Sequence, residues 1–367
     1  MDKIKILYAM GGNMHRAGAE TMIMNYIREL VKYNEFEISV LVHGFDKGDY
    51  DDELKQLGVS IYPVSVRSKN PLGYAGQVSK VFSDNKFDIV HCNMDASSGE
   101  FLKTAKKYKV PVRIAHSHTT SFQAQDILRK LVAAHSKKLV NKVATDRFAC
   151  SKMAGDWLFE NKDYIVVNNA VDLDLFKRNN ETRKKYRDEF GINDHTMVIG
   201  HIGRFSFEKN HNGLLNIFKQ YHMHNSDSVL LCLGSGKLFD DATHQADALG
   251  IKDSVRFLGV RSDINGLLQA MDVFVLPSLF EGLPVVGIEA QAAGLPCIFS
   301  TAVTNEVCIL PTSKRLELEK IDEWVSAIDS VNVGTTIDSY KYMTDAGYSV
   351  KCEAEKLRNY YLNAVSR

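Results

Sequence analysis

Residues 4–30 read IKILYAMGGNMHRAGAETMIMNYIREL, an apolar run followed by a glycine-rich loop and a stretch with helical spacing. The run IKILYAM is short and continuously apolar, which is typical of a buried parallel strand. In AETMIMNYIREL the apolar residues recur at the spacing of one helical face. The stretch therefore predicts a strand–loop–helix unit, the element from which doubly wound α/β sheets are built.

The same alternation fills both halves of the chain. The first half adds four apolar runs, EISVLVH, FDIVHCN, VPVRIAH and RFACS, with helix-period stretches between them. The second half has five more, MVIGHIGR, SVLLCLGSG, SVRFLGV, DVFVLPS and PCIFS. We therefore predict an α/β protein of two Rossmann-like doubly wound domains facing a cleft, residues 1–170 and residues 171–349, with a last helix over about 350–367.

Composition narrows the class of protein. The 367 residues are 45% hydrophobic and 25% charged, as in soluble globular proteins. No apolar run approaches the roughly 20 residues of a membrane-spanning helix. The start MDKIKILYAM lacks a signal-peptide layout, and the six cysteines are scattered without CxxC pairs. A cytoplasmic protein with reduced thiols is expected.

Charge is balanced overall but not locally. Residues 101–147 hold eleven Lys and Arg, opposed by Asp126 and Asp146 alone. This region suggests an anionic partner, and a peripheral contact with anionic lipid on the inner face of the membrane is one hypothesis. A solvated helix face is the alternative. Nucleic acid is disfavoured because the net charge is zero and no nucleic-acid-binding motif is present.

Two glycine-rich turns follow predicted strands. GGNMHRAGAE does not match G-x-G-x-x-G, yet it enters a helix N-terminus, where free N–H groups attract anions. A plain tight turn is the alternative. LGSGKL lacks the residues of a phosphate-binding P-loop, because Leu231 stands at its first glycine and Leu238 at its Ser/Thr position.

A basic turn, GRFSFEKN, follows the first strand of the second half. Arg204 and Lys209 lie five residues apart in it. A guanidinium and an ammonium that converge on one spot form a phosphate clamp. A solvated basic turn is the alternative.

A pair of histidines ends the strand VPVRIAH. His116 and His118 are two residues apart, so they share one face of an extended segment. A zinc site would need a third ligand at suitable spacing, and none is evident, so no metal is predicted. His118, at the carboxyl end of a strand, is a candidate site residue.

The segment LFEGLPVVGIEAQAAG, residues 279–294, carries two glutamates in apolar surroundings. Pro284 suits the first turn of a helix, with Glu281 in the loop before it and Glu289 inside. The N–H groups of Gly282, Leu283, Val285 and Val286 then become available to an anion. Hydroxyl groups on both sides of a phosphate would account for both carboxylates, and a nucleotide-sugar has that layout. A solvated Glu281 with an ordinary helix Glu289 is the alternative.

Together these motifs resemble the retaining GT-B glycosyltransferases of family 4, especially bacterial capsule and exopolysaccharide enzymes. The E-x7-E motif is met by Glu281 and Glu289. GRFSFEKN, AHSHTT, NNAVDLDLF and RAGAETMIMNY also match the pattern, so the resemblance covers nearly the whole chain.

The resemblance implies a role for each matched residue. Arg204 and Lys209 correspond to the diphosphate clamp, Glu289 to the ribose-binding glutamate and Glu281 to the acid that contacts the transferred sugar. The other implied donor-site residues are Gly282, Leu283, Pro284 and Val285, whose backbone approaches phosphate and sugar, and Val260, near the base.

In the first domain the resemblance places His118 near the reacting sugar. Gly18 matches the second glycine of a Gly-Gly loop whose first position here is Ala17, which takes φ > 0 less freely. The helix at 350–367 is implied to pack back on this acceptor-binding domain, while residues 171–349 bind the nucleotide-sugar. Catalytic roles fall to His118, Glu281, Arg204 and Lys209.

The implied activity is retaining transfer of a hexosyl or N-acetylhexosaminyl group from a UDP-sugar to a lipid-linked or oligosaccharide acceptor, without metal or cofactor. Preorganised positive charge would stabilise the leaving diphosphate. Glycosidases also use two carboxylates, but a basic clamp and glycine turns suit a diphosphate donor. The alternatives are a nucleotide-sugar epimerase of the same fold and a non-catalytic nucleotide-sugar-binding protein.

Overall fold

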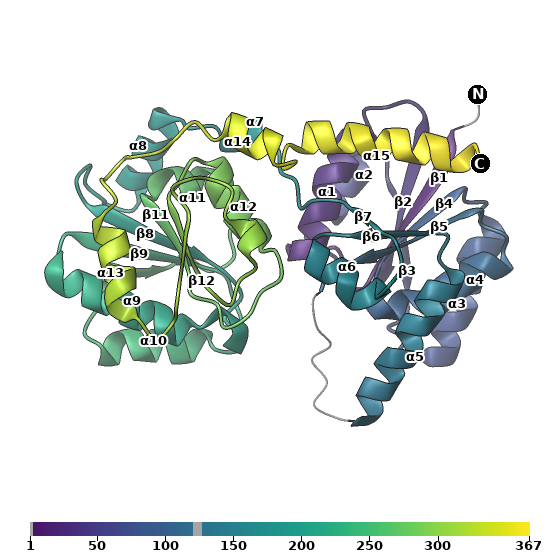
Figure 1. Ribbon diagram of the computed structural model, residues 1–367, viewed down its shortest axis with the longest axis horizontal. Coiled ribbons are helices and arrows are strands. Elements are labelled where there is room, and N and C mark those ends of the chain that lie inside the picture. Colours follow the sequence, from purple (N-terminus) through teal and green to yellow (C-terminus); the bar gives the residue numbers. More distant parts are fainter. Residues whose placement is uncertain (1–2, 120–126) are drawn as a thin grey trace. The chain divides into compact units, whose positions relative to one another are not determined.

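The computed structural model describes residues 3–119 and 127–367, and their side chains apart from those of residues 127–133. The chain divides into two compact units. The N-terminal unit comprises Met1–Ala170 with Val350–Arg367, and the C-terminal unit comprises Val171–Ser349. Each unit is one parallel sheet with helices on both faces (Figure 1), so the predicted pair of Rossmann-like domains is confirmed.

The N-terminal unit holds a seven-stranded sheet in the order β3-β2-β1-β4-β5-β6-β7. Its strands are β1 (Ile4–Met10), β2 (Phe36–His43), β3 (Ser60–Val64), β4 (Ile89–Asn93), β5 (Val112–Ser117), β6 (Asp146–Ala149) and β7 (Ile165–Val166). Its helices are α1 (Gly18–Leu30), α2 (Asp51–Gln56), α3 (Pro71–Asp84), η1 (Asp95–Ser97), α4 (Ser98–Lys107), α5 (Ile127–Val143), α6 (Lys152–Phe159) and α15 (Val350–Val365).

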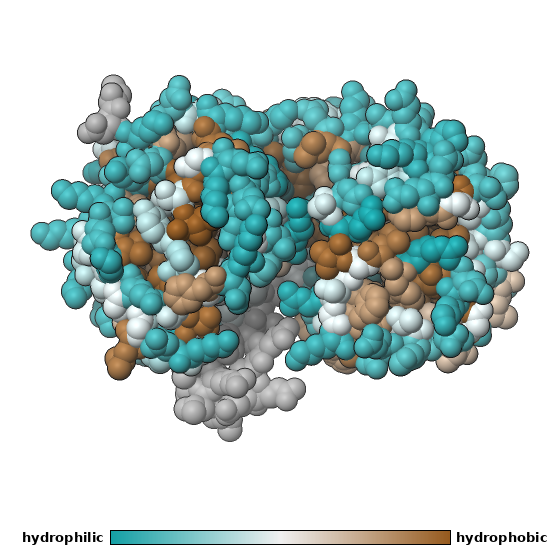
Figure 2. All heavy atoms as spheres, turned by 180° about the vertical axis from the view of Figure 1, so that it is seen from behind, coloured by the Kyte–Doolittle hydropathy of each residue, from teal (hydrophilic) through white to brown (hydrophobic). Residues whose placement is uncertain are grey.

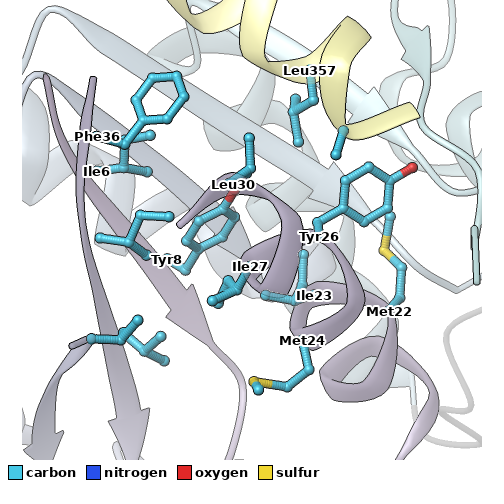
Figure 3. Packing of buried hydrophobic residues seen from close by; sticks show 14 of the residues in the cluster. Ile6, Tyr8, Met22, Ile23, Met24, Tyr26, Ile27, Leu30, Phe36 and Leu357 are labelled. Carbon is cyan, nitrogen blue, oxygen red and sulfur yellow. The ribbon is translucent and has the colours of Figure 1, made fainter. Parts of the chain in front are cut away.

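Two apolar layers enclose this sheet because side chains alternate along each strand. In β1, Ile6 and Tyr8 face the layer formed with α1 and α15, whereas Leu7 faces the layer formed with α3, α4, α5 and α6. Figure 3 shows the first layer, where Leu357 of α15 packs together with residues of α1 and β1. A helix from the end of the chain thus completes the core of the N-terminal unit.

The C-terminal unit holds a six-stranded sheet in the order β10-β9-β8-β11-β12-β13. Its strands are β8 (Met197–Ile202), β9 (Ser228–Leu233), β10 (Val255–Phe257), β11 (Val273–Leu276), β12 (Cys297–Ser300) and β13 (Lys314–Leu316). Its helices are α7 (Leu173–Phe176), α8 (Asn180–Glu189), η2 (Phe207–Lys209), α9 (His211–His224), α10 (Phe239–Ala248), η3 (Lys252–Ser254), α11 (Ile264–Ala270), α12 (Val285–Ala292), η4 (Asn305–Val307), α13 (Ile321–Asp329) and α14 (Tyr340–Asp345).

A buried charge cluster joins α8 to the sheet of this unit. Asp272 is fully buried and accepts hydrogen bonds from Arg183 at 2.6 Å and Arg187 at 3.2 Å. The same carboxylate accepts the backbone N–H of Val198 at 2.8 Å and of Gly334 at 2.8 Å. Because all four donors are satisfied by one buried acid, the start of β8 and the chain near Gly334 are fixed to each other.

Hydrophilic residues cover most of the face drawn in Figure 2, with small hydrophobic areas between them. Within the described part of the chain, no helix combines the length and the apolar character needed to cross a bilayer.

Candidate functional site

The loops that follow β8 and β11 form the centre of the candidate site. These strands are neighbours and run parallel, so their carboxyl ends lie at the same edge of the sheet. Arg204 lies just beyond β8, and Lys209 is the last residue of η2 in the same loop. Glu281 lies in the loop between β11 and α12.

The structure brings Lys209 and Glu281 into contact. The ammonium of Lys209 forms an ion pair with Oε1 of Glu281, and the two side chains are only 15% and 16% exposed. Ser278 Oγ donates a second hydrogen bond to the same carboxylate oxygen at 3.3 Å. Arg204 is exposed at the same sheet edge. The 72-residue separation between Lys209 and Glu281 is therefore closed by the pairing of β8 with β11.

Backbone contacts fix the two loops to each other. The N–H of Leu279 donates to the carbonyl of Glu208 at 2.8 Å. Asn210 adopts a left-handed conformation with φ 54°, which short polar side chains tolerate. From there its side chain caps α9 and donates to the carbonyl of Pro277 at 3.0 Å. Lys209 is therefore held next to the glutamate loop by the main chain as well as by charge.

The glycine turn after β9 supports the Arg204 loop. Gly234 has φ +132°, and a Cβ there would lie 2.0 Å from the carbonyl oxygen of Gly203. Gly236 has φ +159°, and a Cβ there would lie 2.3 Å from the carbonyl oxygen of Phe205. The N–H of Phe205 in turn donates to the carbonyl of Ser235 at 2.9 Å. The LGSGKL stretch is thus a strand-to-helix turn whose glycines allow two backbones to touch.

The helix after Glu281 begins one residue later than predicted. Pro284 is extended, with ψ 119°, and stands before Val285 as the N-cap, without a side-chain hydrogen bond to the helix. The first N–H groups of α12 therefore point out of the helix end without a side-chain cap. Glu289 is half-buried inside α12.

The remaining predicted donor-site residues of the C-terminal unit lie in the loop that contains Glu281 and in the loop after β10. Gly282 is half-buried, and Leu283 is buried at 6% exposure. Val260 is 61% exposed in the loop after β10, so it belongs to the same carboxyl edge of the sheet. Next to it, Gly259 accepts the N–H of Gly234 at 2.8 Å, which connects this loop to the glycine turn.

In the N-terminal unit, Gly18 is the first residue of α1. Ala17 precedes it in an extended conformation and makes no side-chain cap. A Cβ at Gly18 would meet no atom within 4 Å, so the backbone here borders open space. Both features leave this helix end accessible to an anion.

His118 follows β5 and is held by two residues that the sequence analysis missed. Its Nε2 lies 2.9 Å from Oδ1 of Asn93, the last residue of β4. Oδ1 of Asp95 accepts the backbone N–H of His118 at 2.6 Å and of Thr119 at 3.1 Å. Burial lowers the pKa of His118, although the nearby Asp95 carboxylate acts in the opposite direction. His118 is therefore a neutral imidazole near pH 7.

Asn93 and Asp95 were detectable in the sequence. They stand at and just beyond the carboxyl end of FDIVHCN, the position that selected His118. Across residues 3–119 and 127–367, no three His, Cys, Asp or Glu side chains gather as metal ligands would.

The basic region 101–147 has mixed roles. Lys137 donates to the carbonyl of Trp157 at 2.6 Å and lies over its ring, and Arg113 and Arg147 bind backbone carbonyls. Residues 120–126 and the side chains of 127–133, with Asp126, Arg129 and Lys130 among them, lie outside the described part. The exposed lysines are Lys103, Lys106, Lys107, Lys109, Lys138 and Lys142.

The C-terminal site therefore combines cations, helix N–H groups and carboxylates at one sheet edge. Such a set matches a phosphate ester flanked by hydroxyl groups. Comparison with known proteins gives the family of the chain. The family described as glycosyltransferase family 4 matches residues 16–175, and the family described as glycosyl transferases group 1 matches residues 182–331. A putative glycosyltransferase of Bacillus subtilis strain 168, EpsF, is 35% identical over 88% of this chain and 86% of its own length.

The chain belongs to glycosyltransferase family 4. A second relative of this family 4 enzyme is the UDP-Gal:alpha-D-GlcNAc-diphosphoundecaprenol alpha-1,3-galactosyltransferase of Escherichia coli, 28% identical over 78% of each chain. Solved structures give the GT-B fold. HepE of Anabaena in complex with UDP-glucose has a TM-score of 0.72 at 19% identity and covers 99% of both chains. Sucrose-phosphate synthase of Thermosynechococcus elongatus has a TM-score of 0.80 at 14% identity, covering 99% of this chain and 100% of its own.

Proposed function

We propose that this glycosyltransferase moves a sugar, with retention of configuration, from a UDP-sugar to a lipid-linked or oligosaccharide acceptor in capsule or exopolysaccharide synthesis. The name of the Escherichia coli relative gives a UDP-sugar donor and a diphosphoundecaprenol-linked acceptor, and a Staphylococcus aureus relative is named for capsular polysaccharide biosynthesis. The HepE structures contain UDP or UDP-glucose.

The contact between Lys209 and Glu281 carries the proposal within this chain. It places one cation and one carboxylate side by side, at the sheet edge that Arg204 and the uncapped start of α12 share. In the proposed complex the diphosphate accepts from Lys209 and Arg204, while Glu281 accepts from a hydroxyl of the sugar. Glu289, one helix turn or more further on, accepts from the ribose.

Catalysis in this proposal is electrostatic. The UDP leaving group gains negative charge as the glycosidic bond breaks, and fixed cations and N–H dipoles stabilise that charge without reorganising. Lys209 is preorganised because Asn210 and Leu279 hold its loop. Loss of one such donor typically lowers the rate by about 10²–10³. The proposed reaction uses no metal, since these groups supply the positive charge, and a chelator is expected to leave turnover unchanged.

The decisive experiment measures release of the nucleoside diphosphate by Arg204→Ala and Lys209→Ala from a panel of UDP-, GDP- and ADP-sugars, with and without acceptor. Both variants should lose about 10²-fold or more in turnover. Arg204→Ala should keep the melting temperature, and Lys209→Ala should lower it only modestly because Glu281 loses its ion pair. Lys219→Ala is the matched control, because Lys219 donates to the carbonyl of Leu249 in the same unit away from the site.

Wild-type turnover in both site variants would contradict the proposal. Conversion of the UDP-sugar to its epimer without any acceptor would indicate an epimerase instead. UDP binding with neither transfer nor hydrolysis across the panel would indicate a binding protein.

A lipid-linked acceptor would also require contact with the membrane surface. Lys106, Lys107, Lys109, Lys138 and Lys142 are exposed in the basic region and would face anionic lipid near a lipid-linked acceptor. Co-sedimentation with vesicles of anionic and neutral phospholipid should be strong at low salt and weak at high salt. Binding that does not respond to salt would count against this surface.

A further inference from the structure

Two histidines lie in the core of the N-terminal unit, where apolar residues are usual for a parallel sheet. His91 of β4 and His116 of β5 are both fully buried. Burial lowers the pKa of His91 to about 3 and the pKa of His116 well below its ordinary value. Both are therefore neutral, and Nε2 of His91 lies 2.9 Å from Nδ1 of His116 in a hydrogen bond.

The pair is connected to α15. Nδ1 of His91 lies 2.6 Å from the hydroxyl of Tyr361, a fully buried residue of that helix. The hydroxyl of Tyr361 lies 2.8 Å from the hydroxyl of Tyr8 in β1. Each of these hydrogen bonds satisfies a polar group that would otherwise be buried without a partner. The bonds therefore fix the positions of the four side chains relative to one another.

At its other end the pair supports His118. The ring of His116 stacks on the ring of His118, with centroids 4.2 Å apart and planes 30° apart. Asp95 fixes the backbone of the same residue through the N–H of His118. The ring of His118 is thus held on one face by His116, and its backbone is held by Asp95.

Asn93 sets the position of the proton on this imidazole. Its Nδ2 donates to the carbonyl of His91 at 3.3 Å, which turns Oδ1 toward Nε2 of His118 at 2.9 Å. A carbonyl oxygen only accepts, so Nε2 carries the hydrogen. In a neutral imidazole the other nitrogen, Nδ1, then has a lone pair that accepts.

We propose that Asn93, backed by the His91–His116 pair and Tyr361, is a positioning residue that holds His118 as the Nε2–H tautomer, so that Nδ1 accepts a hydrogen bond from a hydroxyl of the transferred sugar. The inference rests on the proposed function and on the resemblance to family 4, which implies that His118 lies near the reacting sugar. It deepens that function by requiring a sugar with a hydroxyl donor at that place. A deoxy analogue of the sugar would leave Nδ1 of His118 without a hydrogen-bond donor, so the site should strongly disfavour that analogue.

The tautomer is measured directly by NMR of the full chain labelled with 15N-histidine. Two-bond 1H–15N correlations separate the two neutral tautomers among the 12 histidines, and His118→Gln assigns the signal by its loss. The wild type should show Nε2–H for His118, and Asn93→Ala should show a mixture of tautomers. An Nδ1–H tautomer in the wild type, or the same spectrum in Asn93→Ala, would overturn the proposal.

Kinetics test the consequence. Asn93→Ala should lower kcat at least about tenfold while donor KM stays within about twofold, as expected for loss of an interaction in the transition state. Asn85→Ala, which removes a half-buried amide bonded to the carbonyl of Val81 in the same unit, should keep kcat. An equal loss in both variants would assign the effect to folding and sink the positioning role.

The buried chain supplies a graded test. Tyr361→Phe removes the partner of Nδ1 of His91, so it should move the His116 and His118 signals more than Tyr8→Phe does. Equal shifts in both variants would contradict the role of Tyr361. The NMR result needs no substrate, so a failure of the proposed function in the Arg204 and Lys209 variants would be recognised separately.

Discussion

Lys209 and Glu281 form an ion pair in the free protein, although the proposed function assigns each of them to a different part of the donor. If Lys209 serves the diphosphate and Glu281 the sugar, each must exchange its protein partner for the donor. The same contact explains how a carboxylate is tolerated in the apolar LFEGLP loop, because it is paired and hydrogen-bonded.

This exchange predicts a divided effect for Glu281→Gln. Removing the carboxylate frees Lys209, so UDP, which has no sugar, should bind about two- to fivefold more tightly, as for release of a partly exposed ion pair. Turnover of the UDP-sugar should fall, because a sugar hydroxyl loses its charged acceptor. Isothermal titration with UDP and a UDP-release assay check the two halves. Weaker UDP binding by Glu281→Gln would contradict the claim that Glu281 competes with the diphosphate for Lys209.

At the residue scale, the loops after strands could be predicted and the contacts within them could not. Arg204, Lys209, Glu281 and His118 all follow strands, and the structure places each of them there. The amide of Asn93 reaches His118 across a sequence separation of 25, and Tyr361 reaches His91 across 270. Such contacts depend on strand order and helix docking, which periodicity does not contain.

At the element scale, the central strands and the edge strand β10 were predicted, whereas the other three edge strands were missed. β3 and β13 lie at sheet edges, as does β7. β7 has two residues, β13 is the largely polar KRL, and β3 is interrupted by Pro63. An edge strand buries less surface and tolerates proline, so its apolar signal is weak. The central strands are buried on both faces and stand out as apolar runs.

The stacked turns after β8 and β9 predict a steric effect for Gly234→Ala. Its Cβ would lie 2.0 Å from the carbonyl oxygen of Gly203, which must shift together with the Arg204 loop. We expect a loss of about 2 kcal/mol or more in unfolding free energy, together with weaker UDP binding. Chemical denaturation and titration measure the two effects.

Gly58→Ala is the control for this substitution. Gly58 also has positive φ, +76°, but a Cβ there meets no atom within 4 Å. It should therefore show only the backbone strain of about 1–2 kcal/mol. Equal effects of the two substitutions would mean that the contact between the turns matters little.

At the scale of the whole molecule, the unfolding of each unit can be measured separately because each unit contains one of the two tryptophans. Trp157 lies in α6 of the N-terminal unit and Trp324 in α13 of the C-terminal unit. The variant Trp324→Phe therefore keeps only Trp157, which reports on the N-terminal unit. The variant Trp157→Phe keeps only Trp324, which reports on the C-terminal unit.

Leu357→Ala tests the dependence of the N-terminal unit on α15. Leu357 is 5% exposed in the core shared with α1, so its truncation should cost about 2–5 kcal/mol. The unfolding midpoint reported by Trp157 should fall, and the midpoint reported by Trp324 should stay. A shift of the Trp324 midpoint alone would contradict the assignment of α15 to the N-terminal unit.

Both units are expected to lose stability in mild acid. Burial lowers the pKa of His91 to about 3 and the pKa of His211 to about 4, whereas unfolded histidine titrates near 6.5. Between these values the unfolded chain binds more protons, so stability rises with pH and is lost as pH falls below about 6.5. Each histidine contributes a slope of up to about 1.4 kcal/mol per pH unit.

A substitution isolates this effect in the C-terminal unit. His211 stacks on Phe205 with centroids 3.9 Å apart and has no hydrogen-bond partner for either ring nitrogen among the described atoms. His211→Phe should flatten the acid dependence of the midpoint reported by Trp324, whereas replacing the exposed His224 by Gln should keep it. An unchanged slope in His211→Phe would contradict the linkage.

The position of α15 also has a consequence for biosynthesis. Val350–Arg367 leaves the ribosome after all of Val171–Ser349, although it belongs to the core built by Met1–Ala170. The domain translated second therefore has its entire sequence available before the domain translated first does. Until α15 is translated, the nascent N-terminal unit lacks the helix that completes the layer containing α1. At roughly 5–20 residues per second this delay lasts about ten to forty seconds. During that interval the apolar surface that α15 later covers is exposed to solvent.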